Sequence, residues 1–465
     1  MNRRFKEYGL IGLGLVAGIL VSLNFSAQAE KDTPLPLPIE ELRAFSDVFG
    51  RIKSDYVEPV SDKKLITEAI NGMLSGLDPH SAYLDAEGFK ELQVGTQGEF
   101  GGLGIEVGME DGLVKVISPI EDTPAFNAGI KSGDFIIKID DVMVKGLSLN
   151  DAVKKMRGKV GVSVMLTIAR KTETKPLQIS VTRAVIKVQS VKAKMIDPGY
   201  GFVRITQFQE HTGENLATAL QKLHKENNGA LQGLVLDLRN DPGGLLTGAV
   251  AVSAAFLPKD ALVVYTEGRT EDAKMRLMAS SDYYLRGSGK EDYLKDVPSD
   301  FKNVPLVVLM NGGSASASEI VAGALQDHKR AVVMGTQSFG KGSVQTILPL
   351  GNNTAIKLTT ARYYTPSGRS IQAKGIVPDI VVEDPATSAT ENAFRLREAD
   401  LGNHLINDKQ PESKPDTSSK PAPKATPKTE DSGKKVEVAE FGAKNDYQLN
   451  QAMNLLKGMN ILRGK

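Results

Sequence analysis

The chain of 465 residues contains no cysteine, and this absence excludes several kinds of chemistry. It can form no disulfide, hold no lipid on a cysteine, and offer neither a thiol nucleophile nor thiolate ligands for zinc. Its five histidines are scattered, and none of them lies beside a glycine-rich turn. The formal net charge is only +1, so nothing points to a nucleic acid or an anionic surface as a partner.

The first 29 residues have the pattern of an export signal. A basic start, Met1–Lys6, precedes an apolar run at 10–23, and Ala27-Gln28-Ala29 fits a small-x-small cleavage site. The apolar run is shorter than the roughly 17–25 residues of a membrane-spanning helix. We therefore expect cleavage after residue 29 and a soluble protein in the periplasm. Anchoring to the inner membrane by an uncleaved signal is the alternative.

The chain after the signal is long enough for two or three domains, and its first part is helical. Apolar side chains recur at helical spacing through 39–56 and again through 63–77. This spacing predicts amphipathic helices with one apolar face each. We place an N-terminal helical region at 30–95.

A different pattern begins at Gly101, where short alternating strands are separated by turns and one short helix. A glycine-rich loop before a strand can direct N–H groups at a peptide carboxylate, and the open strand edge can pair with the peptide backbone. Together with the run Ala128–Asp134 (AGIKSGD), this is typical of a PDZ domain, placed at 96–184. A small β-domain that only packs against its neighbours is the alternative. The candidate peptide-binding residues are Gly101, Gly102, Leu103, Gly104 and Ile105.

The stretch 304–345 has the features of a nucleophile site. An apolar, β-branched run at 304–310 ends in Asn311-Gly-Gly, and a helix follows the small residues SASAS at 314–318. Such a turn exposes a side chain, and the helix N-terminus offers N–H groups to a developing oxyanion. The serines could equally be ordinary helix caps. The residues alone do not choose among Ser314, Ser316 and Ser318.

A nearby base would decide between a nucleophile and a cap. His328 lies at the far end of the predicted helix, so a Ser-His-Asp triad is not suggested. Lys341 stands between two glycines and could act as a base if desolvation lowers its pKa, although such a lysine could also bind an anion. On a strand, Gln345 would share a face with Lys341 and could orient its amine.

The arrangement of strand, Gly-Gly turn and helix recurs at 231–246, where the strand ends in Asn240-Asp-Pro-Gly-Gly. Two such turns side by side could form an oxyanion hole from two backbone N–H groups. Within the strand, we expect Asp237 and Arg239 to form a structural ion pair.

The segment from Gly313 to Gln345 resembles the catalytic segment of the carboxy-terminal processing peptidases, which are PDZ-containing serine proteases with a Ser-Lys dyad. The resemblance covers nearly all of the chain between the signal and the C-terminal tail. It implies no metal and no organic cofactor. The roles it implies are nucleophile for Ser316, general base for Lys341, assistance by Gln345, and oxyanion donors at Ala317 and at Gly243 or Gly244.

These patterns predict an α+β multidomain protein. The protease core at 185–385 should be α/β, with stacked strand-turn-helix units, next to a PDZ domain that is a small β-sandwich with helices. Residues 386–465 should be a flexible linker, with a helix at 391–401, followed by a C-terminal helix. The apolar stripe of that last helix, at 446–462, needs a partner, which could be its own core, another subunit or another protein. Of these we expect another subunit.

The expected function is that of an exported serine endopeptidase. Its partners should be protein or peptide substrates with apolar C-termini, captured by the PDZ domain. The resemblance further implies self-association through the N-terminal helices, hence a homo-oligomer, and it allows for an adaptor protein. A non-catalytic PDZ scaffold that binds protein C-termini is the competing interpretation.

Overall fold

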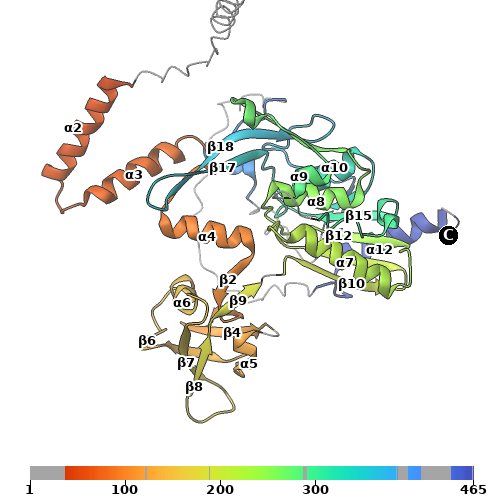
Figure 1. The fold of residues 1–465 in the computed structure, drawn as a ribbon, viewed down its shortest axis with the longest axis horizontal. Helices are drawn as coiled ribbons and strands as arrows, with labels where there is room; N and C mark the ends of the chain where they lie inside the picture. The colour runs from red at the N-terminus through yellow and green to blue at the C-terminus, as the bar shows by residue number, and fades with distance from the viewer. Residues whose placement is uncertain are drawn as a thin grey trace, which may run out of the picture. The chain divides into compact units, whose positions relative to one another are not determined.

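The computed structural model describes residues 37–110, 112–120, 123–187, 189–285, 291–383, 385, 396–409, 441–462 and 464 (Figure 1). The predicted export signal lies outside these residues. The chain divides into two compact units, Met1–Glu68 and Ala69–Lys465. In the described part of the chain, no helix combines the length and the apolar character needed to span a membrane.

The first unit contains α2 (Ile39–Asp55) and the first half of α3 (Asp62–Ser75), which confirms the two predicted helices. An ion pair of 2.7 Å joins Lys53 near the end of α2 to Asp62 at the start of α3. The apolar face of α2 is exposed at Leu42, Phe45 and Val48. Self-association through this face stays a prediction.

The second unit begins with the rest of α3. After β1 (Ala82–Leu84) and α4 (Ala86–Gln97), it forms the small β-domain. Its main sheet has the strand order β3-β4-β5-β7-β8, with β6 paired to β5. These strands are β3 (Ile105–Glu110), β4 (Leu113–Pro119), β5 (Phe135–Ile139), β6 (Val142–Met143), β7 (Ser163–Ala169) and β8 (Leu177–Thr182). The short helices are α5 (Pro124–Asn127) and α6 (Leu149–Met156). A separate ribbon of β2 (Glu99–Gly102) and β9 (Ala184–Lys187) brackets the domain.

The protease core is built on a six-stranded sheet of order β10-β11-β12-β15-β16-β19. Only β10 is antiparallel to its neighbour. The strands are β10 (Val191–Asp197), β11 (Tyr200–Ile205), β12 (Gly233–Asp237), β15 (Leu306–Met310), β16 (Val332–Gly335) and β19 (Ile380–Val381). The central strands β12 and β15 are buried along their whole length, as expected for parallel strands covered on both faces.

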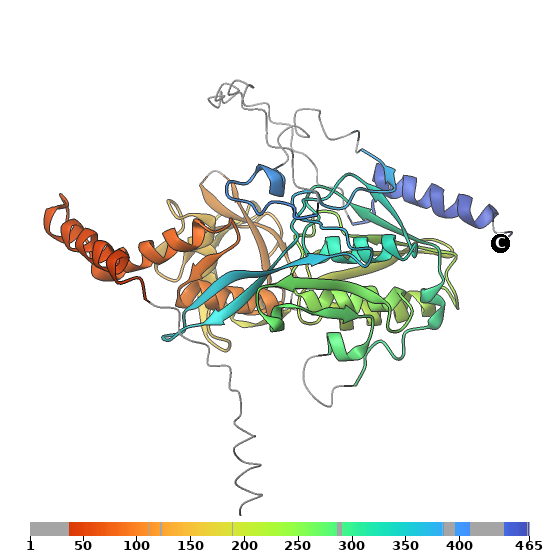
Figure 2. The same ribbon diagram turned by 90° about the horizontal axis from the view of Figure 1, so that it is seen from above.

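Alternate residues of these strands pack into two different cores. Leu234 and Leu236 of β12 belong to the core formed with α7 (Thr212–Glu226), α8 (Leu246–Phe256) and α10 (Ala317–Asp327). Val235 between them points to the opposite face, which is covered by α12 (Tyr447–Leu462). The sheet therefore lies between two layers of helix, with α12 at the C-terminal end of the chain (Figure 2).

The expected subunit contact of the C-terminal helix is wrong, because the apolar stripe of α12 packs on its own sheet. Its buried residues lie against Val235, Val307 and Leu309; they are Leu449, Ala452, Met453 and Leu456. The predicted Asp237–Arg239 ion pair is confirmed at 2.8 Å. Arg239 also pairs with Asp446, just before α12, at 2.6 Å, so the same arginine ties the helix to the sheet.

A second sheet lies beside the core, with β18 (Ala355–Tyr364) at its centre. The hairpin of β17 (Ser343–Pro349) and β18 is drawn in blue-green in Figure 2. On its other edge β18 pairs with β1 and with β13 (Leu262–Gly268), which in turn pairs with β14 (Arg276–Met278). Part of the predicted linker is packed here: residues 398–400 form a short 3-10 turn, and Glu398 is fully buried.

Candidate active site

Ser316 lies in a strained turn between β15 and α10. Its φ and ψ are 56° and −112°, a backbone conformation that residues with a side chain rarely adopt. The serine therefore stands on a sharp strand-to-helix turn of the kind that presents a nucleophile.

The structure distinguishes the three serines that the sequence left open. Ser314 and Ser318 are fully buried, and their hydroxyls donate to the carbonyl oxygens of Leu238 and Asp241, at 2.8 and 2.9 Å. Ser316 is only partly buried. Of the three serines, Ser316 is therefore the one that a substrate could reach.

The buried carboxylate of Glu319 joins the Ser316 turn to the Lys341 loop. Its Oε2 accepts hydrogen bonds from the backbone N–H of Ser316 at 2.7 Å and of Lys341 at 3.0 Å. Its Oε1 accepts from the Ser338 hydroxyl at 2.6 Å and the Gly340 N–H at 2.7 Å. Burial raises the pKa of Glu319 to about 7, although these donors stabilise the charged form. Glu319 is not among the site residues predicted from the sequence. The spacing Ser316-x-x-Glu319 is a capping-box pattern, and this pattern could have indicated that Glu319 contacts the Ser316 backbone.

Lys341 lies in the loop before β17, and its side chain is partly buried. Burial lowers its pKa from the ordinary value of 10.5, and the positive charge of Lys357 lowers the pKa further. Among the described residues, its amine donates no hydrogen bond. The Tyr363 hydroxyl interacts with the Ser316 hydroxyl and donates a hydrogen bond to the Lys341 carbonyl oxygen. The structure thus brings the serine and lysine backbones together without a direct bond between the side chains.

Gln345 is hydrogen-bonded to two residues other than the predicted partner Lys341. Its amide Nε2 donates to the hydroxyls of Ser343 at 3.0 Å and Thr359 at 3.1 Å. The expected shared face with Lys341 depended on a regular strand. Lys341 precedes β17, however, and a bulge between Val344 and Gln345 breaks the alternation.

The two candidate glycines of the oxyanion turn differ in position. A Cβ on Gly243 would lie 2.8 Å from both the Ser316 Cβ and the Ala317 nitrogen, so this backbone is packed against the serine turn. Its N–H donates to Asp241 Oδ1 at 2.9 Å. Gly244 instead bridges to Phe208, through bonds that use the Gly243 carbonyl and the Leu245 N–H. The structure therefore brings Gly243 and Ala317 together and sets Gly244 against a neighbouring strand end.

Asp241 is a fully buried carboxylate beside this turn. Its Oδ2 has no hydrogen-bond partner within the described part of the chain. Burial raises the pKa of Asp241 to about 7. A buried carboxylate with an unmatched oxygen costs folding free energy when it is ionised.

The candidate peptide-binding residues divide between two elements. Gly101 and Gly102 belong to β2 and pair with β9. Leu103 is buried in the core of the small domain, and a Cβ on Gly104 would collide with Thr123. Ile105 begins β3, which pairs with β4 alone and so presents an open edge. The loop between the two strands is Leu103–Gly104, and carboxylate binding by this segment stays a prediction.

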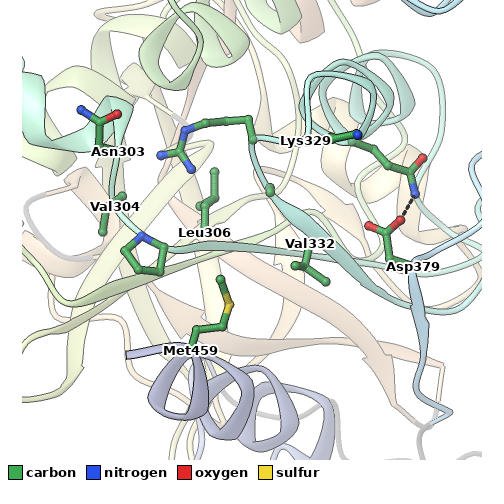
Figure 3. Close-up of a pocket in the computed structure, with 11 residues that line it drawn as sticks. Asn303, Val304, Leu306, Lys329, Val332, Asp379 and Met459 are labelled. Atoms are coloured by element: carbon green, nitrogen blue, oxygen red, sulfur yellow. Dashed lines mark hydrogen bonds between the residues drawn. The ribbon is translucent and has the colours of Figure 1, made fainter. Parts of the chain in front are cut away.

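A cavity of about 300 Å³ lies elsewhere on the core (Figure 3). It is lined by residues at the start of β15 and β16, including Leu306 and Val332, and by Met459 of α12. Figure 3 shows Asp379 on its wall, bonded to the Gln326 amide at 2.9 Å. The candidate catalytic residues lie instead beyond the carboxyl end of β15, so this cavity is separate from them.

Comparison with known families defines the class. A model of peptidase family S41 matches residues 199–382, a PDZ domain model matches 101–181, and a model named "Activating protease CtpB N-terminal domain" matches 21–88. The chain is thus a serine peptidase of the S41 class that carries a PDZ domain. This confirms the predicted class and the predicted fold; the exact domain boundaries stay predictions.

Similar proteins narrow the class further. The carboxy-terminal-processing protease of Bartonella bacilliformis is 46% identical over 447 residues, which cover 95% of each chain. CtpB of Bacillus subtilis is 37% identical over 382 residues, covering 80% of this chain and 75% of the relative. This protein belongs to the carboxy-terminal processing proteases, which favours the enzyme over the PDZ scaffold.

Among solved structures, the photosystem II D1 C-terminal processing protease is similar to this chain. It is 29% identical with a TM-score of 0.41, and the match covers 74% of this chain and 88% of that one.

Replacing Asp241 by Asn should make the protein more stable toward neutral pH. Because the folded-state pKa of Asp241 is raised from 3.8 to about 7, the folded state binds the extra proton and loses stability as the pH rises through that window. Asp241→Asn removes this loss, so its free energy of unfolding should exceed that of the wild type by up to about 4 kcal/mol at pH 7. Denaturant unfolding between pH 4 and pH 8 measures the difference.

The matched control is Asp272→Asn, at an exposed aspartate. It should follow the wild type at every pH. An Asp241→Asn difference that does not grow with pH would contradict the assignment of a buried, costly charge.

Proposed function

We propose that the protein cleaves protein chains with Ser316 as nucleophile and Lys341 as general base. The observation that carries the proposal is the Glu319 carboxylate, one oxygen of which holds the backbone of both residues. The lowered pKa of Lys341 supports the role of base, because a base must be free of its proton.

The chemistry follows the usual two steps of a serine hydrolase. Neutral Lys341 takes the hydroxyl proton of Ser316, and the oxygen attacks a peptide carbonyl. The oxyanion is received by the Ala317 N–H and a donor of the Gly243 turn. The lysine then protonates the leaving amine, and water releases the acyl group.

The described conformation is not yet arranged for that reaction. Among the described residues the lysine amine has no hydrogen bond to the Ser316 hydroxyl, and the Gly243 N–H is still bonded to Asp241 Oδ1, so both groups must turn. Catalytic hydrogen bonds often tighten only when substrate is bound. Gln345, held between Ser343 and Thr359, assists the lysine in that arrangement.

Ser316→Ala and Lys341→Ala should each reduce kcat by more than about 10³-fold while the protein stays folded. In the wild type, kcat/KM should fall as the pH drops through the pKa of Lys341, because protonation removes the base. Cleavage of a reporter protein, with thermal unfolding as a check on folding, measures both effects.

Ser314→Ala is the control, since that hydroxyl is buried in a structural contact. Substantial activity in Ser316→Ala or in Lys341→Ala would exclude the proposed pair. So would a kcat/KM that stays constant down to acid pH.

The PDZ domain selects, in our proposal, substrates with an apolar residue at a free C-terminus. The open edge of β3 can pair with an extended peptide, and the loop Leu103–Gly104 precedes it. On the Ser316→Ala variant, a peptide with an apolar free C-terminus should bind at least about tenfold more tightly than its C-terminal amide. Fluorescence polarisation measures the affinities; equal affinity for acid and amide would refute carboxylate recognition.

Export to the periplasm, with removal of residues 1–29, is the proposed localisation, supported by the basic start, apolar run and Ala27-Gln-Ala29 site. The intact mass of the protein from the periplasmic fraction should correspond to a chain that begins at Glu30. A chain that keeps Met1 would contradict cleavage, and recovery of that chain in the membrane fraction would favour the anchored alternative.

A further inference from the structure

The segment 396–409 lies beyond the part of the chain that matches the S41 family, yet it returns to the lysine loop. Glu398 in this segment is fully buried, and its backbone N–H donates to the Phe339 carbonyl oxygen at 3.1 Å. Phe339 lies two residues before Lys341, so the segment is fastened directly to the loop that carries the proposed base.

The side chain of Glu398 holds the other end of the same loop through Gln372. Its Oε1 accepts a hydrogen bond from Gln372 Nε2 at 2.9 Å. The Gln372 Oε1 in turn accepts from the Gly342 N–H at 3.0 Å. Phe339 and Gly342 bracket Lys341, so Glu398 fixes the loop on both sides.

A histidine from the opposite end of the chain holds the carboxylate in place. His80 Nε2 lies 2.8 Å from Glu398 Oε2 and 3.0 Å from its Oε1. The backbone N–H of His80 donates to Asp78 at 2.8 Å, so the histidine is itself anchored. A carboxylate this deeply buried needs hydrogen-bond donors, and His80 Nε2 can supply one.

We propose that Glu398 is a positioning residue for the general base: with His80 and Gln372 it fixes the Lys341 loop, and its negative charge sets the charge balance around the amine. The inference rests on the proposed role of Lys341. Glu398 does not touch the reacting atoms. It acts through the position of the Lys341 loop and through the electrostatic effect of its charge on the Lys341 amine.

The charged groups around the Lys341 amine decide whether the Glu398 charge raises or lowers the pKa of Lys341. Lys357 on β18 favours the neutral amine, whereas Glu398, Glu319 on α10 and Asp78 favour the charged one. Tyr363 also faces the site, and its hydroxyl stays protonated because its pKa is raised well above the ordinary value. Removing the charge of Glu398 should therefore lower the pKa of Lys341 further.

Two substitutions in the full-length enzyme separate fixing from charge. Glu398→Ala removes the charge and the side-chain bonds to Gln372 and His80, and leaves the backbone bond to Phe339. It should lower kcat by on the order of 10- to 100-fold with little change in KM, since a misplaced base slows the chemical step. Glu398→Gln keeps an acceptor for Gln372, so its plateau kcat should lie within a few-fold of the wild type. The acid limb of its kcat/KM profile should move to lower pH.

Asp400→Asn is the matched control. It removes a carboxylate from the same turn, and this carboxylate accepts the Arg397 N–H at 2.9 Å. Its pH profile and kcat should equal those of the wild type. His80→Ala should lower kcat as Glu398→Ala does. The double variant should lose no more kcat than either single variant, because both substitutions remove the same His80–Glu398 contact.

Thermal unfolding shows which variants are folded. If Glu398→Ala is not folded, the pH profile of Glu398→Gln alone tests the inference. An acid limb unmoved in Glu398→Gln would overturn the inference, as would a wild-type kcat in a folded Glu398→Ala. Ser316→Ala and Lys341→Ala in the same assay keep the two proposals apart: if either remains active, the proposed function fails, whatever Glu398 does.

Discussion

The Glu319 carboxylate accepts the backbone N–H groups of Ser316 and Lys341 on a single oxygen, at 2.7 and 3.0 Å, and the arrangement of the site depends on this contact. Two loops that are separate in sequence are thereby held at a fixed spacing. The other oxygen accepts hydrogen bonds from Ser338 and Gly340, so the carboxylate cannot move with one loop alone. The four donors that surround the carboxylate offset part of the free energy that burial of its charge costs.

The fold explains why strain collects at this point. The site lies where parallel strands end, the edge of an α/β sheet at which turns converge. Ser316 has a positive φ, and Gly243 packs so closely against it that no side chain would fit. The extensive burial of β12 and β15 offsets such local costs.

Features that short motifs encode could be predicted from the sequence, whereas contacts between residues far apart in the chain could not. The turn around Ser316 and the strands of the PDZ domain follow from local patterns. Glu398 and His80 are 318 residues apart, and neither has a neighbour pattern that reports the other. The stripe of α12 predicted a helix correctly but not its partner, because a subunit and its own sheet offer the same kind of apolar face. The face on which Gln345 lies depends on one bulge, which alternation alone cannot show.

The central claim is that a desolvated amine at Lys341 loses its proton more easily than an ordinary lysine. Direct titration by NMR of the protein labelled at the lysine side-chain carbons tests it, with the Lys341 signal assigned by its loss in Lys341→Arg. The account predicts a midpoint below the ordinary value of 10.5. A midpoint at or above that value would contradict it.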